Sequence, residues 1–313
     1  MSGITIGTRG SPLAMRQANH VRDAILRLDP DKSVKLKIIK TSGDRELKGP
    51  GRGGLGKGMF TKEIENELLA GSISLAVHSL KDLPIDIPEG LAVTAVTLRE
   101  DPADAVISKS GQPLSALPAG AKILTGSLRR KGQVLHSRPD LLVEPVMGNL
   151  QTRLRKLDES DAEAMILACA GLLRAGLGDR ITERLDPAEF LPACGQGALA
   201  LEIRQDDCRM HEFLAPLDDF PTRLAVTAER SLLAVLGGGC QVPIGAFGRF
   251  TGDDDVLTLT GMISTVDGGA LLRATESARV SDTSSAKRLG QTLCRQLNLQ
   301  GGRQILAGIT GQS

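Results

Sequence analysis

The segment Ile73-Ser74-Leu75-Ala76-Val77-His78-Ser79-Leu80-Lys81-Asp82 joins a short apolar run to a polar loop. The run Ile73–Val77 has the length and composition of a buried strand. Ligands of α/β proteins bind in the loops that follow the carboxyl ends of such strands. Asp82 is therefore a candidate site residue, although a lone loop aspartate is more often a cap or a turn former. Lys81 beside it would keep the carboxylate ionised, whereas His78 has no partner at a metal-ligand spacing and is expected to be structural.

Short apolar runs alternate with helix-like segments through the first two-thirds of the chain, which predicts parallel sheets covered by helices. The expected strands are Gly3–Thr8, Val34–Lys40, Ile73–Val77, Leu91–Val96, Ala103–Ser108, Lys122–Thr125, Leu141–Pro145 and Ala164–Ala168. The expected helices are Pro12–Leu28, Thr61–Ala70, Arg129–Arg138 and Leu150–Glu159. Asp101-Pro102 and Leu191-Pro192 mark crossovers between two α/β lobes.

After Pro221 the pattern changes and indicates a small α+β domain. Its expected elements are an amphipathic helix at Thr222–Leu236, an antiparallel strand at Val256–Ile263 that Ala270–Thr275 can pair with, and a closing helix at Ser284–Leu299. The tail from Gly301 is expected to fray.

The composition excludes several classes of function. With 313 residues, of which 41% are hydrophobic and 24% charged, the chain is typical of a soluble globular protein. A net charge of +1 gives no global attraction to nucleic acid or to a membrane, and 2% aromatic residues leave little for stacking on bases. The cysteines are five, widely spaced and without a C-x-x-C pair, which supports neither a disulfide framework nor a metal site. No secretory segment and no run of about 20 apolar residues is present, so a cytoplasmic protein is expected.

Arginines recur where expected strands meet expected helices. Thr125-Gly126-Ser127-Leu128-Arg129-Arg130 places two of them in a first helical turn, where arginine opposes the helix dipole. The placement is explained if the terminus receives an anion, to which Ser127 and backbone N–H groups also donate; a solvated charge pair is the plainer alternative. Arg9-Gly10-Ser11-Pro12 repeats the pattern after the first strand. Further arginines near element ends are Arg153, Arg155 and Arg174. Together they indicate a cleft for a polycarboxylate or polyphosphate.

Two glycine-rich segments carry candidate chemistry. Gly237-Gly238-Gly239-Cys240-Gln241-Val242-Pro243-Ile244-Gly245 presents a thiol on a bare turn. This suits an attachment point or nucleophile, and equally a helix C-cap beside a bystander thiol, so the segment alone leaves both open. Gly51-Arg52-Gly53-Gly54-Leu55-Gly56-Lys57-Gly58 satisfies G-x-G-x-x-G, but a polar stretch separates it from the preceding strand. We interpret it as a mobile lid over an active site, with Lys57 reaching an anion.

Six motifs in this order make the chain resemble the porphobilinogen deaminase (hydroxymethylbilane synthase) family from about residue 4 to about residue 310. They are Thr8-Arg9-Gly10-Ser11-Pro12-Leu13-Ala14, Ala76-Val77-His78-Ser79-Leu80-Lys81-Asp82, Gly126-Ser127-Leu128-Arg129-Arg130, Gly148-Asn149-Leu150-Gln151-Thr152-Arg153-Leu154, Leu191-Pro192-Ala193-Cys194-Gly195-Gln196-Gly197-Ala198 and Gly239-Cys240-Gln241-Val242-Pro243-Ile244-Gly245. Chance agreement of all six in order is not credible.

The resemblance implies a fold of three domains. The first two are α/β domains like those of type II periplasmic binding proteins, with the active site between them, and the third is a small α+β domain. Domain 1 is expected at 1–98 with 198–216, domain 2 at 102–192 and domain 3 at 220–313. In the family, domain 3 holds a dipyrromethane cofactor through a cysteine thioether, and Cys240 matches that cysteine. The enzyme builds this cofactor from its own substrate, and a monomer without metal is implied.

The resemblance also implies a reaction and a set of site residues. Four porphobilinogen molecules are joined head to tail with loss of ammonia, and hydroxymethylbilane, a linear tetrapyrrole, is released. Asp82, with Lys81, is implied as the catalytic residue that passes protons and stabilises cationic intermediates. Residues implied in cofactor binding are Cys240, Lys81, Asp82, Thr125, Ser127, Arg129, Arg130, Gly148 and Arg153. Residues implied in substrate binding are Arg9, Ser11, Lys57, Phe60, Arg174 and Gln196, the last at a hinge back into domain 1.

Met147 departs from the family pattern. The family usually reads Arg-Gly-Asn before the Thr-Arg-Leu helix, and its arginine belongs to the carboxylate-binding set; here the segment is Val146-Met147-Gly148-Asn149. Methionine cannot pair with a carboxylate, so Arg52 or Arg155 would have to compensate. We expect impaired turnover or chain elongation with cofactor attachment intact. The glycine-rich segment also differs from the family pattern, which leaves its lid contacts open.

Two other functions fit part of the sequence. An anion-binding receptor or sensor would share the two lobes and the arginines, but it would need neither Cys240 on its glycine turn nor the Lys81-Asp82 pair. A degenerate paralogue would hold the dipyrromethane without turning over, and Met147 is the residue that favours it. Whether the product feeds haem, chlorophyll or cobalamin synthesis is not determined by the sequence.

Met147→Arg should raise kcat/KM for porphobilinogen by about tenfold, because a charge-assisted hydrogen bond contributes about 1.5–3 kcal/mol. Steady-state kinetics of the variant beside the unmodified chain measure this, with intact mass reporting the cofactor content of both. Unchanged kinetics would show that this position does not limit turnover.

Overall fold

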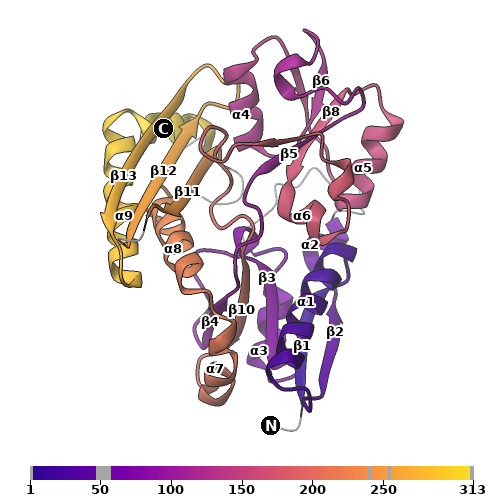
Figure 1. Cartoon of the computed structure of the whole chain (residues 1–313), viewed down its shortest axis with the longest axis vertical. Helices are drawn as coiled ribbons and strands as arrows, with labels where there is room; N and C mark the ends of the chain where they lie inside the picture. Colours follow the sequence, from indigo (N-terminus) through magenta and orange to yellow (C-terminus); the bar gives the residue numbers. More distant parts are fainter. Residues whose placement is uncertain (1–2, 47–57, 238–241, 253–254, 311–313) are drawn as a thin grey trace. The chain divides into compact units, whose positions relative to one another are not determined.

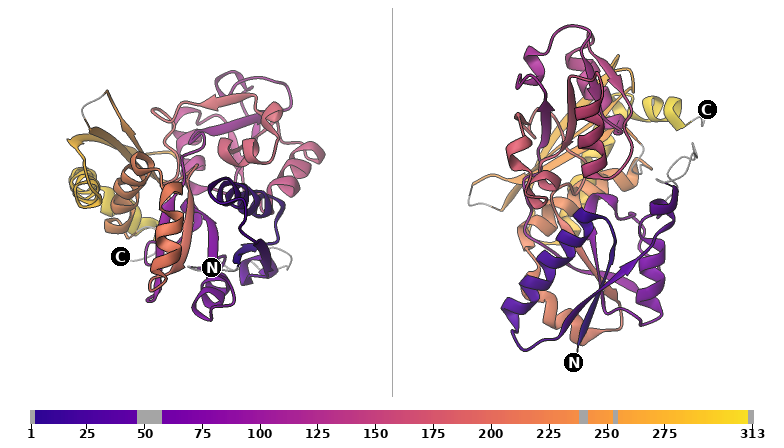
Figure 2. Two further views of the ribbon diagram at one scale, coloured as in Figure 1. Left: turned by 60° about the horizontal axis from the view of Figure 1, so that its bottom comes forward. Right: turned by 90° about the vertical axis from the view of Figure 1, so that its right-hand side faces the viewer.

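The computed structural model describes residues 3–46, 58–237, 242–252 and 255–310. The chain divides into two compact units, residues 1–100 with 197–223 and residues 101–196 with 224–313. Most of their helices and strands are labelled in Figure 1, and Figure 2 shows the same ribbon from two further sides.

The first unit is built on a sheet of strand order β2-β1-β3-β10-β4. Its elements are β1 Ile4–Arg9, α1 Pro12–Leu28, β2 Val34–Ile39, α2 Ser42–Glu46, α3 Lys62–Leu69, β3 Leu75–Ser79, the 3-10 turn η1 Leu80–Asp82, β4 Leu91–Val96, β10 Leu199–Arg204, α7 Cys208–Leu214 and η4 Ala215–Leu217. β1 pairs in parallel with β2 and β3, whereas β10 is antiparallel to β3 and β4. The prediction of parallel sheets is therefore only partly right here, because β10, which the sequence pattern did not reveal, runs antiparallel to its neighbours.

Helix α1 occupies the range expected from the sequence and holds the loop that precedes it. Ser11 caps it by accepting a hydrogen bond from the Ala14 N–H, and Pro12 stands in its first turn. Val21 and Ile25, one helical turn apart, lie in a core that also contains strand residues of β1, β3 and β10. α3 belongs to a separate core that includes Ile73. The β1–α1 loop is thereby fixed at the carboxyl end of β1.

The second unit begins with a sheet of order β7-β6-β8-β5-β9. Its elements are β5 Asp104–Ser108, η2 Leu114–Ala116, β6 Lys122–Leu124, α4 Leu128–Ser137, β7 Leu142–Glu144, α5 Leu150–Glu159, β8 Ala164–Ala168, α6 Cys169–Arg174, η3 Gly178–Arg180 and β9 Glu183–Leu185. β6 is parallel to β7 and β8, but β5 is antiparallel to β8 and β9, so this sheet is mixed as well. Two cores divide its helices, α5 and α6 in one and α4 in the other.

The C-terminal part of the second unit is an antiparallel sheet of order β11-β12-β13 with helices packed on it. Its elements are α8 Phe220–Val235, whose first residues lie in the first unit, β11 Ile244–Phe250, β12 Val256–Ser264, β13 Leu271–Arg279, α9 Thr283–Leu299 and α10 Gly302–Thr310. β11 was not expected, because Gly245 and Gly248 interrupt its apolar pattern. A Cβ on Gly245 would lie 2.9 Å from the Leu191 carbonyl oxygen, and one on Gly248 would lie 3.2 Å from that of Ala225. Close backbone approach requires glycine at both places.

The expected fraying of the tail from Gly301 is wrong. Residues Gly302–Thr310 form α10, and Leu306 is 8% exposed in the C-terminal core with Leu297 of α9. A Cβ on Gly302 would lie 2.7 Å from the Ile263 Cδ1 atom, so the helix begins in contact with β12. Tertiary packing, rather than local propensity, holds this short helix.

Leu306→Ala should lower the free energy of unfolding by about 2–4 kcal/mol, as expected when a buried leucine is truncated. Urea denaturation followed by circular dichroism measures the change. Gln304→Ala, an exposed residue of the same helix, is the matched control and should change the stability by less than about 0.5 kcal/mol. Equal effects of the two substitutions would contradict a packed α10.

Candidate active site

Asp82 ends η1, the 3-10 turn that directly follows β3 in the first unit. The Leu80 N–H donates to the Ala198 carbonyl oxygen at 3.0 Å, which ties this turn to the start of β10. A cavity of about 40 Å³, large enough for a water molecule, opens beside the turn. Its lining includes Arg9, Gln17, Phe60, His78, Ser79 and Asp82. The structure therefore brings three of the predicted residues, from β1, η1 and the segment before α3, to one cavity at the carboxyl ends of β1 and β3.

Arg9 lies at the end of β1 and already has a carboxylate partner. Its Nε donates to Asp44 Oδ1 at 3.1 Å, and its guanidinium carbon lies 4.0 Å from the centroid of the Phe60 ring. Burial raises the pKa of Asp44, but hydrogen bonds from Arg9 and Thr41 lower it further, so the net shift is downward. Asp44 thus stays ionised and orients Arg9. The sequence analysis did not single out Asp44.

His78 has a buried partner that the sequence could not reveal. Its Nε2 lies 3.0 Å from Glu202 Oε2, because β10 pairs with β3 and brings the two side chains together. Glu65 of α3 is the other buried carboxyl near this pair. Burial is the largest cause that raises the pKa of Glu65, and the charge of Glu202 raises it further. The hydrogen bond with Thr61 and the charge of His78 lower this pKa, but the net shift is upward.

Two loops of the second unit carry the predicted hydroxyl and backbone donors. Thr125 is buried and its Oγ1 accepts from the Ser127 N–H at 3.3 Å, while Ser127 caps α4. In the second loop, Gly148 has a φ of +124°, which favours glycine, and its carbonyl oxygen accepts from Arg153 Nε at 2.8 Å. Both loops precede helix N-termini, where backbone N–H groups suit an anion.

The side chains of Arg129 and Arg130 are buried against the carboxylate of Asp104 and are not the solvated charge pair that was the plainer alternative. Arg129 Nη1 donates to Asp104 Oδ2 at 2.6 Å, and Arg130 Nη2 donates to Asp104 Oδ1 at 2.7 Å. Burial by itself would raise the pKa of Asp104, but the two guanidinium charges outweigh it and hold this pKa well below the usual range. Sequence reasoning missed Asp104, although a charged residue at the start of an apolar strand was a usable signal, since aspartate is rarely buried unpaired.

Gln196 is fully buried, and its side-chain amide donates to Asp104 Oδ1 at 2.9 Å and to the Pro102 carbonyl oxygen at 2.7 Å. Arg174 is the last residue of α6 and is half-buried. Lys81 lies within η1 next to Asp82. Lys57 and Cys240 lie outside the described residues. Their predicted roles, like those of the other site residues, stay predictions.

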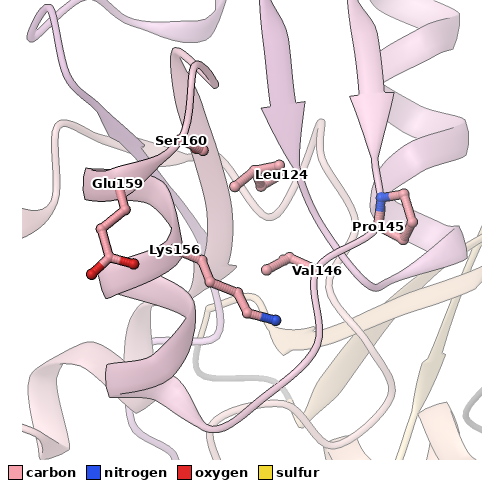
Figure 3. Close-up of a pocket in the computed structure, with 6 residues that line it drawn as sticks. All are labelled: Leu124, Pro145, Val146, Lys156, Glu159 and Ser160. Carbon is pink, nitrogen blue, oxygen red and sulfur yellow. The ribbon is translucent and has the colours of Figure 1, made fainter. Parts of the chain in front are cut away.

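A second cavity, of about 270 Å³, lies in the second unit and holds none of the predicted site residues. Figure 3 shows its lining, in which Lys156 and Glu159 come from α5 and Val146 from the loop after β7. Lys156 Nζ donates to the carbonyl oxygen of Met147 at 3.1 Å. This cavity therefore lies beside the loop that contains Met147, and it is not the predicted active site.

Comparison with known proteins places the chain in a family. A family model described as "Porphobilinogen deaminase, dipyromethane cofactor binding domain" matches residues 4–212, and one described as "Porphobilinogen deaminase, C-terminal domain" matches residues 223–298. Porphobilinogen deaminase of Syntrophobacter fumaroxidans is 47% identical over 306 residues, covering 98% of this chain and 97% of the relative. The porphobilinogen deaminase of Desulforudis audaxviator is 49% identical with the same coverage. The solved structure of YhfZ from Shigella flexneri overlaps 75% of this chain and 97% of its own at a TM-score of 0.37 and 15% identity, too distant to carry an argument.

The fold and the matches define a class first: an α/β enzyme with a cofactor-binding domain and a separate C-terminal domain. The expected fold class is confirmed, with two mixed α/β sheets and a small antiparallel C-terminal sheet covered by helices. The chain belongs to the porphobilinogen deaminase family and carries that family's dipyrromethane cofactor binding domain.

Asp104→Asn should flatten the response of stability to acid. Because the pKa of Asp104 is depressed in the folded state, its ionised form stabilises the protein above the unfolded-state pKa of about 3.9, and this contribution is lost as the pH falls toward the folded-state pKa. Between pH 4 and pH 3 the unmodified chain should lose about 1 kcal/mol more unfolding free energy than the variant. Urea denaturation at both pH values measures this. Identical losses would mean that Asp104 is not ionised in its buried cluster.

Proposed function

We propose that this chain joins porphobilinogen units with loss of ammonia on a dipyrromethane held by Cys240, the porphobilinogen deaminase reaction, and that the residues described above carry it out. The observation that carries the proposal is the position of Asp82 in the turn after β3 and of the paired arginines in the first turn of α4, in a chain that family models match from residue 4 to 212 and from 223 to 298. Porphobilinogen and the dipyrromethane both bear acidic side chains, and the start of α4 supplies cationic and N–H donors for them.

Asp82 is the residue we assign to the chemistry. When porphobilinogen loses its protonated amine as ammonia, a positive charge is left on the pyrrole and its methylene carbon, and a fixed carboxylate stabilises that charge. When bound, the dipyrromethane supplies the free pyrrole carbon that attacks this cation. Asp82 would take up the proton released when the new bond forms and pass it to the departing ammonia, so that ammonium is the by-product. Lys81, the preceding residue of the same turn, is assigned to the site with it.

The second unit's donors fit the carboxylates of the cofactor. Ser127 and Thr125 lie at the N-terminus of α4 with Arg129 and Arg130, and Gly148 and Arg153 lie at the N-terminus of α5. A helix N-terminus adds backbone N–H groups to each set, and a guanidinium can meet a carboxylate in two parallel hydrogen bonds. These residues are assigned to the cofactor, with Cys240 as its covalent anchor.

The remaining assignments concern the incoming substrate. Arg9 and Ser11 of the β1–α1 loop, and Arg174 at the end of α6, are assigned to porphobilinogen carboxylates. Phe60 lies against Arg9 and lines the cavity with Asp82, which supports a place at the substrate's entrance for it and for Lys57. None of the described helices is long and apolar enough to span a bilayer. The cytoplasmic location and the monomeric state stay predictions.

A chain that holds the cofactor without turning over is the second candidate, and Met147 favours it. Met147 is 45% exposed, and its sulfur would lie 3.8 Å from a Cβ on Gly126, so it borders the loop that carries Thr125 and Ser127. A thioether at that place adds no charge to bind a carboxylate.

Intact mass spectrometry of the purified protein beside Cys240→Ser tests the proposal. The unmodified chain should carry an adduct of two porphobilinogen units less two ammonias, absent from the variant, and porphobilinogen should add a ladder of further masses that then clears. A ladder that forms and stalls would favour the second candidate. No adduct at any stage would overturn the deaminase proposal and favour an anion-binding protein.

A further inference from the structure

Three charged side chains of the second unit are buried together with unequal charge. Asp104 is fully buried, and Arg129 and Arg130 are only 4% and 6% exposed. Because arginine stays protonated in proteins, two guanidinium groups against one carboxylate leave an excess of positive charge. Burial is the main cause that lowers the pKa of Arg129, ahead of the opposing effect of Asp104. A buried charge without a partner is costly, so the cluster is balanced only when a second anion joins it.

Both oxygens of the Asp104 carboxylate accept hydrogen bonds from neighbouring side chains. Oδ1 accepts from Arg130 Nε at 3.0 Å, from Arg130 Nη2 at 2.7 Å and from Gln196 Nε2 at 2.9 Å, while Oδ2 accepts from Arg129 Nη1 at 2.6 Å. Charge-assisted hydrogen bonds of this kind fix the direction of a side chain as well as contributing energy. Asp104 therefore fixes the orientation of both guanidinium groups.

The two arginines keep donors that these contacts do not use. Arg129 Nη1 also donates to the Leu191 carbonyl oxygen at 2.6 Å, and Arg130 Nη1 donates to that of Ile166 at 3.2 Å. Nε and Nη2 of Arg129 take part in none of the hydrogen bonds found among the described residues. The excess charge and these donors occupy the first turn of α4, whose backbone adds to the positive potential.

We propose that Asp104 is a positioning residue for carboxylate binding: it holds Arg129 and Arg130 so that their remaining N–H groups meet one carboxylate. The inference rests on the proposed carboxylate-binding role of the two arginines. The carboxylate comes from the dipyrromethane or from porphobilinogen, and both present the same chemistry. Gln196 in turn holds Asp104 through its amide, which makes it a positioning residue in place of the substrate-contacting residue expected from the sequence.

This arrangement explains why the arginines are held by a single aspartate. Without it, two like charges in one buried place would repel, and one guanidinium would turn toward water. With two carboxylates already present, the pair would be neutral and would have no charge left to attract a ligand. A single aspartate fixes the orientation of both guanidinium groups and leaves a net positive charge that attracts a carboxylate ligand.

Asp104→Asn and Gln196→Leu test the proposal in the full chain, expressed with its own cofactor. Intact mass reports the fraction that carries dipyrromethane, steady-state kinetics report KM and kcat for porphobilinogen, and thermal denaturation shows that each variant is folded at the assay temperature. Gln296→Leu is the matched control. Gln296 of α9 is a half-buried glutamine whose amide also donates to a carboxylate, that of Glu276, but it contacts neither Asp104 nor the two arginines.

For Asp104→Asn we expect one of two results. A cofactor content at least threefold lower would show that the arginines bind a carboxylate of the dipyrromethane. A KM at least tenfold higher with an unchanged cofactor content would show that they bind a carboxylate of porphobilinogen. The kcat of the loaded fraction should stay within threefold, because Asp82 is untouched. Gln196→Leu keeps both ion pairs and should change the same one of these two quantities, cofactor content or KM, by about threefold. This variant tests the proposal even if Asp104→Asn does not fold. Gln296→Leu should change neither cofactor content nor KM.

Three outcomes would overturn the proposal. The first is a folded Asp104→Asn variant with unchanged cofactor content and KM. The second is an unchanged Gln196→Leu variant where Asp104→Asn does not fold. The third is an effect of Gln296→Leu as large as that of Gln196→Leu. Arg129→Lys distinguishes a failure of the positioning role from a failure of the proposed carboxylate-binding role of the arginines. If Arg129→Lys also leaves content and KM unchanged, the arginines do not bind carboxylates. If it changes them while the Asp104 and Gln196 variants do not, only the positioning role is lost.

Discussion

The ion pairing of Asp104 with Arg129 and Arg130 is the interaction on which the loops of the second unit depend. It joins the first residue of β5 to the first turn of α4. Gln196, the last residue before the chain returns to the first unit, also donates a hydrogen bond to Asp104. The segment that ends at Gln196 is held further along its length. Leu191 is bonded by Arg129 and Gln133, and the buried Glu229 accepts from the Gly195 N–H at 2.7 Å and the Gly248 N–H at 2.9 Å. A continuous set of buried polar contacts therefore runs from the arginines to β11, the strand that follows Cys240 in the sequence.

In the first unit the constraint is different: the short turn that carries Asp82, the residue to which we assign the chemistry, must be held in place. The turn that ends at Asp82 has a single 3-10 turn of its own, too little to be stable alone. Its backbone is bonded to Ala198, and β3 beneath it is fixed between β1 and β10. The pair of His78 with Glu202 is buried at the same strand contact. The position of Asp82 thus depends on a strand that lies more than a hundred residues later in the chain.

Local signals were sufficient wherever a helix is set by its own caps and spacing. α1 and α5 have the ranges that the sequence predicted, because Ser11 and Asn149 cap them and apolar residues recur at helical spacing. The prediction was wrong where packing overrides local pattern. β11 contains glycines demanded by neighbouring backbone, α10 is held by the C-terminal core, and both α/β sheets are mixed because β5 and β10 run against their neighbours.

By itself the sequence determined the family and the reaction class and predicted the residue types of the candidate site, because six short motifs keep their chemistry within a few residues each. Only the tertiary structure decided the partners of those residues. Asp44 beside Arg9, Glu202 beside His78, and Asp104 with Gln196 beside the arginines all come from distant parts of the chain. Periodicity and spacing report on neighbours within a few residues, whereas a buried charge takes whichever partner the folded backbone brings to it. That is why Asp82 and the arginines were found as single residues, and the carboxylates that orient Arg9, Arg129 and Arg130 were not found at all.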